Sequence, residues 1–442
     1  MARAWQVVTI RICSTTSRAG LLGVALLVGC GAPSGLERGG DWDEAQPGLF
    51  STGPYILLGA PGTAYIALRA DGIPAPEVDW WIDRAADRED RPAAQSARAA
   101  PTPAAPGALL ATPASPSPAA SLASTETRAT GDRPPPSRMR TTTARKSDDL
   151  WVAELGDLPS GPVIGYRVRS ALGTTPDYKF RIGAEPGKRF RFAVFGDTRT
   201  GHSVHRSVVE AIDREEVAFT VHTGDMVERG GRQDQWTRFF QIERPLLYDT
   251  PILPLVGNHD VSGRDYFRRY FLHALWSRNE HYFVRDWGNL RVVGVDSGIE
   301  CREGCSQYYF AERALAEGAR RGQLLVMAMH YPPYSSGEHG SSAEVQGPIS
   351  ALARRHGVEL VLTGHDHDYE RTRPIEGTTY IVTGSSGAPI RPVKPRWFTA
   401  EARTEPHYVL VDVEPRRLIV RAVNLAGDTF DTAVIDDNPA RP

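Results

Sequence analysis

The sequence of 442 residues lacks the charge pattern of a nucleic-acid-binding protein. Its 51 lysine and arginine residues are balanced by 53 aspartate and glutamate residues, so the formal net charge is only −2. No long basic block interrupts this balance, and we expect no nucleic acid as a stable partner. Cysteine is also scarce, with four in the chain. The length leaves room for one to three domains with an ample core.

Residues 1–30 have the pattern of an export signal. Three arginines precede an apolar run from Leu21 to Val28, which is too short to span a bilayer. The run ends at Leu-Val-Gly-Cys, which resembles a bacterial lipobox, and the cysteine, Cys30, would become the lipidated first residue. We therefore expect a lipoprotein anchored to a membrane on the periplasmic or cell-surface side. The alternative is an ordinary signal peptide with an incidental cysteine.

The other cysteines agree with export. Cys13 lies in the segment that processing would remove, which leaves Cys301 and Cys305 in the stretch Cys-Arg-Glu-Gly-Cys. In an oxidising compartment this pair predicts a disulfide that closes a small loop. A metal-binding C-x3-C is the alternative, although the chain has no second thiol pair.

The region before residue 187 has the pattern of short strands. Residues 31–47 form a Gly-rich, charged linker. From 48 to 186, apolar runs of strand length with turn signals between them predict a small all-β sandwich. Residues from about 84 to 146 are dominated by Ala, Pro, Ser, Thr and Arg without apolar periodicity, so we expect a disordered insertion in this sandwich.

From residue 187 onward, five apolar strand runs each end in residues of metal-ligand type. In open α/β sheets ligands bind outside the carboxyl ends of the strands, which would gather these side chains at one edge. Each motif alone is unremarkable, and it is their order that is informative. The motifs are Gly-Asp with Asp197, Gly-Asp with Asp225, Gly-Asn-His-Asp with Asn258, His259 and Asp260, the single His330, and Gly-His-Asp-His with His365 and His367.

This ordered set resembles the calcineurin-like metallophosphoesterase superfamily, whose pattern is GD, GDxx, GNH(D/E), H and GHxH. The resemblance covers roughly residue 190 to the C-terminus. It implies, for residues 187–442, an α/β (α+β) four-layer sandwich of two β-sheets flanked by helices. An L-x-x-L-x-x-G-x-x-x-x-Y-x-V stretch and a Y-x-F run in the preceding region resemble the fibronectin-type domain of purple acid phosphatases.

The resemblance also implies two divalent or trivalent metal ions and a small phosphorylated substrate. Carboxylates and imidazoles suit Fe, Mn or Zn. By resemblance, Asp225 would bridge the ions, Asp197 and His367 would bind the first, and Asn258, His330 and His365 would bind the second.

The resemblance gives His259 a catalytic rather than a metal-binding role. His259 would stabilise or protonate the leaving oxygen, and Asp260 would orient it. A metal-bound hydroxide would attack phosphorus in line.

Two positions depart from the family pattern. The usual first motif is Asp-x-His, but Arg199 has the place of the histidine, and Glu228 has the place of the tyrosine of purple acid phosphatases. The first ion thus lacks a ligand unless Glu228, His202 or water replaces it. Arg199 cannot ligate a metal and needs an anionic partner, either Glu228 or the substrate phosphate. We expect it to hold the phosphate and the first metal site to be weak. Arg229 matches the arginine of a GDxxDRG motif and would contact phosphate or form a surface salt bridge.

The remaining histidines fall into two groups. His202 and His339 lie near the motif loops and are weak candidates for substrate contact. The others are expected on the surface or in packing, namely His205, His222, His273, His281, His356 and His407.

Taken together, the residues predict an exported, lipid-anchored, metal-dependent phosphoesterase that hydrolyses a phosphomonoester, as an acid phosphatase does. A phosphodiesterase is the close alternative, because the motifs do not separate the two. A surface binding protein with a degenerate metal site is the alternative that is not an enzyme.

Overall fold

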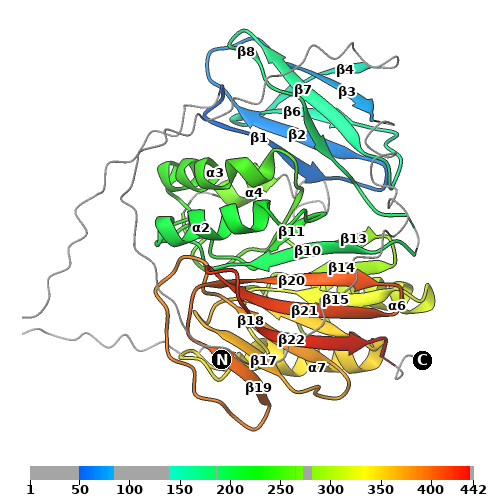
Figure 1. Cartoon of the computed structure of the whole chain (residues 1–442), viewed down its shortest axis with the longest axis vertical. Coiled ribbons are helices and arrows are strands. Elements are labelled where there is room, and N and C mark those ends of the chain that lie inside the picture. The colour runs from blue at the N-terminus through cyan, green and yellow to red at the C-terminus, as the bar shows by residue number, and fades with distance from the viewer. Residues whose placement is uncertain (1–48, 84–138, 186, 264, 272–280, 439–442) are drawn as a thin grey trace, which may run out of the picture. The chain divides into compact units, whose positions relative to one another are not determined.

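The computed structural model describes residues 49–83, 139–185, 187–263, 265–271 and 281–438. Within these ranges an all-β region precedes a larger region of two sheets flanked by helices, which confirms the predicted fold class (Figure 1). None of the helices in these ranges has the length and hydropathy needed to cross a membrane. The predicted signal peptide with Cys30 and the linker at 31–47 lie outside the described residues.

The all-β region consists of two antiparallel sheets. Its strands are β1 (Thr52–Leu58), β2 (Ala64–Arg69), β3 (Glu77–Ile82), β4 (Arg140–Thr143), β5 (Arg145–Ser147), β6 (Leu150–Leu155), β7 (Ile164–Ser170), β8 (Gly173–Thr174) and β9 (Tyr178–Phe180). One sheet has the order β1-β2-β6-β5, and the other has the order β4-β3-β7-β8 with β9 paired to β7. Ile56 and Ile66 of the first sheet share one buried cluster with Trp80 and Tyr166 of the second. A core made by alternate residues of two sheets is that of a sandwich.

Strands β4 and β5 lie inside the segment predicted to be disordered, so that prediction is wrong for residues 140–146. β4 pairs with β3, with Arg140 opposite Trp80, and β5 pairs with β6. The three threonines of β4 are β-branched and suit a strand, and Thr142 Oγ1 accepts the Trp80 Nε1–H at 3.2 Å. The rest of the predicted insertion, residues 84–138, lies outside the described residues.

Two larger sheets follow. The first contains β10 (Phe190–Phe195), β11 (Thr220–His222), β12 (Ile252–Pro254), β20 (His407–Glu414), β21 (Arg417–Asn424) and β22 (Thr429–Asp436), in the order β12-β11-β10-β20-β21-β22. The second contains β13 (Phe283–Trp287), β14 (Leu290–Gly294), β15 (Leu324–Ala328), β16 (Leu360–Thr363), β17 (Tyr369–Thr372), β18 (Thr379–Thr383) and β19 (Thr399–Arg403), in the order β13-β14-β15-β16-β18-β17-β19. Strands β10, β11 and β12 run parallel, as do β14, β15, β16 and β18.

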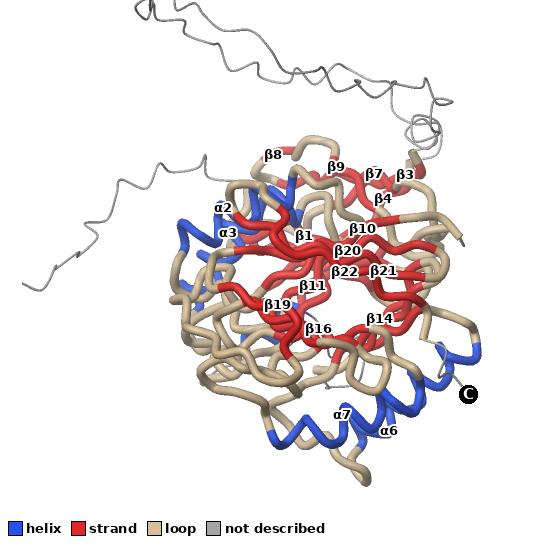
Figure 2. The backbone as a smooth tube through the Cα atoms, turned by 60° about the horizontal axis from the view of Figure 1, so that its bottom comes forward, coloured by secondary structure: helices blue, strands red, loops and turns tan. Residues whose placement is uncertain are grey.

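The two sheets face each other across a shared core, with helices outside (Figure 2). Successive side chains of a strand point to opposite faces. In β10, Phe192 and Val194 therefore join Val326 and Leu362 of the second sheet, whereas Phe195 turns outward to the helices. The helices are α2 (His202–Asp213) and α3 (Gln233–Leu247) against the first sheet, α6 (Ser306–Arg320) and α7 (Ala343–His356) against the second, and the short α4 (Tyr266–Phe271).

The all-β region packs against α3 and α4. Tyr55 and Leu57 of β1 share a buried cluster with Trp236 and Phe240 of α3, and the Tyr55 hydroxyl donates to the backbone O of Tyr270 at 2.6 Å. These aromatic residues of α3 thus bury the face of the β1-β2-β6 sheet that the sandwich core leaves uncovered.

The predicted disulfide between Cys301 and Cys305 is not formed, and both thiols are free. Cys301 is buried in the core between the second sheet and its helices, and this burial raises the pKa of its thiol to about 11. Cys305 Sγ instead lies 3.1 Å from Glu300 Oε2. The two side chains therefore point into different surroundings.

Candidate metal centre

The five predicted motifs all lie beyond the carboxyl ends of strands, but the strands belong to two sheets. Three motifs follow β10, β11 and β12 of the first sheet, and two follow β15 and β16 of the second. The site is therefore built where two facing sheets end, not along one edge. The motif residues are Asp197, Asp225, Asn258, His259, Asp260, His330, His365 and His367.

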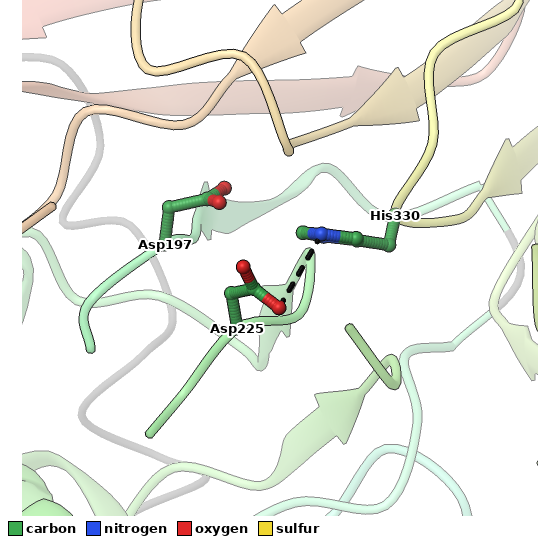
Figure 3. A group of neighbouring side chains, drawn as sticks. All are labelled: Asp197, Asp225 and His330. Carbon is green, nitrogen blue, oxygen red and sulfur yellow. Dashed lines mark ion pairs between the residues drawn. The ribbon is translucent and has the colours of Figure 1, made fainter. Parts of the chain in front are cut away.

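Asp197, Asp225 and His330 form the centre of the site (Figure 3). All three are buried, and one ligand-type atom of each lies within 4.8 Å of the others. His330 Nε2 is 3.4 Å from Asp225 Oδ1. Figure 3 shows the two carboxylates and the imidazole turned toward a common space.

The atoms that meet beside His330 are acceptors only. His330 Nδ1 lies 2.8 Å from the backbone O of Thr223, to which it donates, so its Nε2 carries the lone pair. This Nε2 faces Asn258 Oδ1 at 3.1 Å and Asp225 Oδ1 at 3.4 Å. Burial lowers the pKa of His330, which favours the neutral ring. Carboxylate, amide and imidazole acceptors that converge without a proton between them suit a metal ion, so these residues fit the ion that the resemblance implies.

Asp197 adds a carboxylate oxygen in need of a partner. Its Oδ2 accepts the His365 backbone N–H at 3.0 Å, but its buried Oδ1 has no hydrogen-bond partner among the described residues. Burial, and then the charge of Asp225, raise the pKa of Asp197 well above its ordinary value. A bound cation reverses this penalty because it favours the ionised carboxylate.

His365 and His367 are held as neutral imidazoles. Burial lowers the pKa of His365 to about 3 and that of His367 to about 4. His367 Nδ1 donates to the backbone O of Pro389 at 2.7 Å, so its Nε2 is the atom free to act as an acceptor. The ring centroid of His365 lies 5.1 Å from that of His330. Both rings are in the protonation state that metal binding requires.

The backbone of the motif loops is unusual at the same positions. Asp197, Asp225 and His365 have φ values of 56°, 55° and 71°. Non-glycine residues adopt this left-handed region infrequently, and such strain is common at functional sites. Gly364 permits the close approach, because a Cβ there would lie 2.5 Å from Asp197 Oδ2.

Asp260 does not orient His259 as predicted. Its buried carboxylate accepts four backbone N–H groups, those of Asp225, Met226, Val227 and Gly257, at 2.8–3.2 Å. With both oxygens occupied in this way, Asp260 joins the loop after β11 to the loop after β12. Its contribution is to hold the backbone of Asp225 and of the two residues that follow it.

The orientation of His259 comes instead from a backbone carbonyl. His259 Nδ1 lies 2.9 Å from the backbone O of Glu228, and Nε2 lies 3.9 Å from Asp225 Oδ2. Its side chain is 28% exposed, and the neighbouring Asn258 is exposed as well. His259 therefore lies where the site opens to solvent.

The two arginines predicted to bind substrate lie in different surroundings. Arg199 is 10% exposed and is hydrogen-bonded through Nη1 to Glu228 Oε2. Its predicted substrate role thus competes with a counter-ion already present. Arg229 is exposed, and its backbone N–H donates to Gln235 Oε1 at 2.8 Å. Of the weaker candidates, His202 begins α2 and His339 lies with its ring 4.3 Å from that of His365.

His222, which the sequence predicted to lie on the surface or in packing, is buried and has a further role. Its Nδ1 accepts the Gly224 backbone N–H at 3.2 Å, and its Nε2 lies 3.1 Å from Thr198 Oγ1. His222 therefore links the loop that carries Asp197 to the loop that carries Asp225. Its position two residues before the second Gly-Asp is the sequence signal that could have indicated this link.

Comparisons with known proteins agree with this arrangement. Residues 190–369 match the family model of the calcineurin-like phosphoesterases. "Probable inactive purple acid phosphatase 1" from Arabidopsis thaliana is 25% identical over 296 residues, which cover 53% of this chain and 48% of the relative. "Nucleotide pyrophosphatase/phosphodiesterase" from Hordeum vulgare is 26% identical over 269 residues, which cover 48% of this chain and 73% of the relative. The chain spans about half the length of the Arabidopsis relatives that it matches.

A solved structure shows the same fold over most of the chain. The purple acid phosphatase PPD1 from yellow lupin (Lupinus luteus) seeds superposes with a TM-score of 0.66 at 17% identity, over 87% of this chain and 74% of that chain. The structure titled "Structure of PhoD" gives a TM-score of 0.58 at 14% identity, over 88% and 89% of the two chains. The described part of this chain thus has a purple acid phosphatase-like fold, a region that matches the calcineurin-like phosphoesterase model and a candidate metal centre.

Proposed function

We propose, from the calcineurin-like phosphoesterase domain at residues 190–369, that this chain hydrolyses a small phosphomonoester in a metal-dependent reaction. One observation carries the proposal. His330 Nε2 lies 3.1 Å from Asn258 Oδ1 and 3.4 Å from Asp225 Oδ1, all acceptors, beside Asp197 Oδ1, which has no hydrogen-bond partner among the described residues. Asp225 Oδ1 accepts the backbone N–H of His259 at 3.0 Å, but the buried Nε2 of His330 faces two oxygens. Buried acceptors without a donor are costly, and a bound cation would remove that cost.

The residues that would hold metal are Asp197, Asp225, Asn258 and His330, with His365 beside them. When bound in such a site, divalent ions activate water and neutralise the charge of the phosphoryl oxygens. Asp260 and His222 hold the two aspartate loops in register, so the carboxylates are positioned before any ligand arrives. Little reorganisation is then needed for binding.

His259 is the proposed proton donor to the leaving oxygen. Its Nδ1–H is directed to the Glu228 carbonyl, which turns Nε2 toward the Asp225 side of the site. A proton on Nε2 can be given to an alkoxide that leaves through the open side of the site.

A phosphodiesterase is the second candidate. The Hordeum vulgare relative is named a nucleotide pyrophosphatase/phosphodiesterase, and the matched region covers 73% of its length. The name of the Arabidopsis relative supports a third outcome, a binding protein that has lost activity, because it contains the word "inactive". The intact acceptor cluster favours an active enzyme over that outcome.

We also propose that the all-β region is fibronectin-like, which the two-sheet architecture of strands β1 to β9 supports.

Export and lipid anchoring at Cys30 are the last part of the proposal, and the sequence pattern of residues 1–30 supports them. Cys30→Ser is expected to release the protein from the membrane fraction or to block its processing. A mature protein that still begins at residue 30 and partitions with lipid would require another anchor.

The function is tested with metal-free protein reconstituted separately with Mn²⁺, Zn²⁺ and iron. Turnover is measured on p-nitrophenyl phosphate and phosphoserine as monoesters, and on bis(p-nitrophenyl) phosphate and a dinucleotide as diesters. The proposal expects metal-dependent hydrolysis with a higher kcat/KM for the monoesters. A higher kcat/KM for the diesters would select the phosphodiesterase. If the protein binds no ion and turns over no substrate with any metal, the remaining candidate is a binding protein without enzymatic activity.

A further inference from the structure

The guanidinium of Arg199 lies among the residues that would bind the first of two ions. Its Nε is 3.5 Å from Asp225 Oδ2, its Nη2 is 3.4 Å from His367 Nε2, and its Nη1 is hydrogen-bonded to Glu228. Arginine is a fixed monovalent cation that cannot ligate a metal ion. The half of the site between Asp225 and His367 therefore already contains a positive charge.

His367 shows what this charge does to the donor atoms. Because Nδ1 donates to Pro389, the lone pair on Nε2 is the only one with which His367 could bind an ion. That lone pair faces Arg199 Nη2–H at 3.4 Å and Asp197 Oδ1 at 3.6 Å. A metal ion binds an imidazole nitrogen at about 2.0–2.1 Å, so an ion at Nε2 would be forced against a group of like charge.

The opposite half of the site differs. Asp225 Oδ1, Asn258 Oδ1 and His330 Nε2 converge there with only acceptors turned inward. Asp197, the other carboxylate expected at the first ion, has a ligand atom within 4.8 Å of those of Asp225 and His330. The structure thus gathers both aspartates around one place for an ion.

We propose that Arg199 replaces the first metal ion, so that the site takes a single divalent ion held by Asp197, Asp225, Asn258 and His330. This inference rests on the proposed function, since it concerns the same metal centre. Glu228 supports this replacement, because its carboxylate pairs with the guanidinium of Arg199 and holds it in this half of the site. The divalent ion and the guanidinium would then carry three positive charges. These balance the three negative charges of Asp197, Asp225 and Glu228.

The number of ions per chain tests this inference directly. Full-length protein is freed of metal, reconstituted with excess Mn²⁺, passed through a desalting column and analysed by mass spectrometry of its metal content. We expect one Mn²⁺ per chain, and an electron paramagnetic resonance signal of an isolated ion. Two ions per chain with a spin-coupled signal would overturn the inference and leave the proposed function intact. No bound ion would overturn the proposed function and, with it, the inference.

Two variants test whether Arg199 is what limits the site to one ion. Arg199→His returns an imidazole to the loop and removes the fixed charge, so it is expected to bind two Mn²⁺ per chain. Arg229→His, at an exposed position four residues after Asp225, is the matched control and is expected to remain at one. A folded Arg199→His protein that stays at one ion would overturn the assignment of Arg199. If that variant does not fold, the metal content of the wild-type protein still decides between one ion and two.

Discussion

The carboxylate of Asp260 accepts the backbone N–H of Asp225 at 2.8 Å, so the residue predicted to orient a catalytic histidine instead holds the central aspartate of the site. The same carboxylate accepts the N–H groups of Met226, Val227 and Gly257. One side chain thereby satisfies four buried donors from two loops.

Asp260→Asn is expected to destabilise the fold and weaken metal binding together. An amide offers one acceptor oxygen and turns an NH₂ group toward donors that previously met the second oxygen. Unsatisfied buried N–H groups cost about 1–3 kcal/mol each, so we expect a loss of about 2–5 kcal/mol, visible as a lower Tm. Asp234→Asn, which removes an exposed partner of Arg232, is the control and should leave the Tm unchanged. An Asp260→Asn protein with the Tm and metal content of the wild type would show that the four contacts do not matter.

His259→Ala is expected to separate catalysis from metal binding. The imidazole is bonded to a backbone carbonyl and lies at the open side of the site, so its removal leaves the acceptor cluster intact. We expect unchanged metal content and a kcat lower by about 10²-fold or more, the usual effect of removing a general acid. Parallel loss of metal and activity would identify His259 as a ligand.

The sequence placed the candidate metal-binding residues at the ends of strands, because that information is local. Each ligand-type residue, from Asp197 to His367, follows an apolar run of strand length, and parallel strands bring their carboxyl ends together. The order of the motifs along the chain is what resembles the calcineurin-like metallophosphoesterase superfamily. A local pattern does not show which sheet each strand joins, since β10 and β16 are both apolar runs followed by a glycine but belong to different sheets.

Side-chain partners were the least predictable part. The Glu228 carbonyl orients His259, and neither residue type nor spacing indicates a backbone acceptor. Strand β4 was missed because it follows a stretch rich in proline and serine, and its threonines become a strand only through pairing with β3. The free state of Cys301 depends on the buried cluster in which its side chain packs, which the short Cys-x3-Cys spacing does not reveal.

Removal of residues 84–138 is expected to leave the fold intact. Strands β3 and β4 are antiparallel neighbours with Trp80 opposite Arg140, so a short glycine-rich turn put in place of the segment would have to join only two neighbouring strands. A turn of about five residues can join such a pair. The shortened protein should keep the Tm and the metal content of the full chain. A lower Tm, or loss of soluble protein, would assign a structural role to the removed segment.

His407 is expected to make stability depend on pH. Its ring is buried between Thr383 Oγ1 and the Glu405 carbonyl, and burial lowers its pKa from 6.5 to about 4. Because the folded state disfavours the proton, this stability is present above pH 6.5 and is lost as the pH falls toward 4. His407→Gln does not titrate there, so its stability difference from the wild type should shrink by up to about 3 kcal/mol between about pH 7 and about pH 4. Thermal unfolding of both metal-free proteins measures this, and a difference that stays constant with pH would contradict it.

The central claim is that buried carboxylates hold a metal ion that phosphate-ester hydrolysis requires, and Asp225→Asn tests it most directly. Asp225 contacts His330 on one side and Arg199 on the other, so the substitution removes the negative charge shared by both halves of the site. The decisive measurement is Mn²⁺ content and turnover of p-nitrophenyl phosphate for wild-type and variant proteins of equal Tm. The account predicts bound Mn²⁺ and metal-dependent turnover in the wild type, and loss of both in Asp225→Asn. A variant with the metal content and the turnover of the wild type would contradict it.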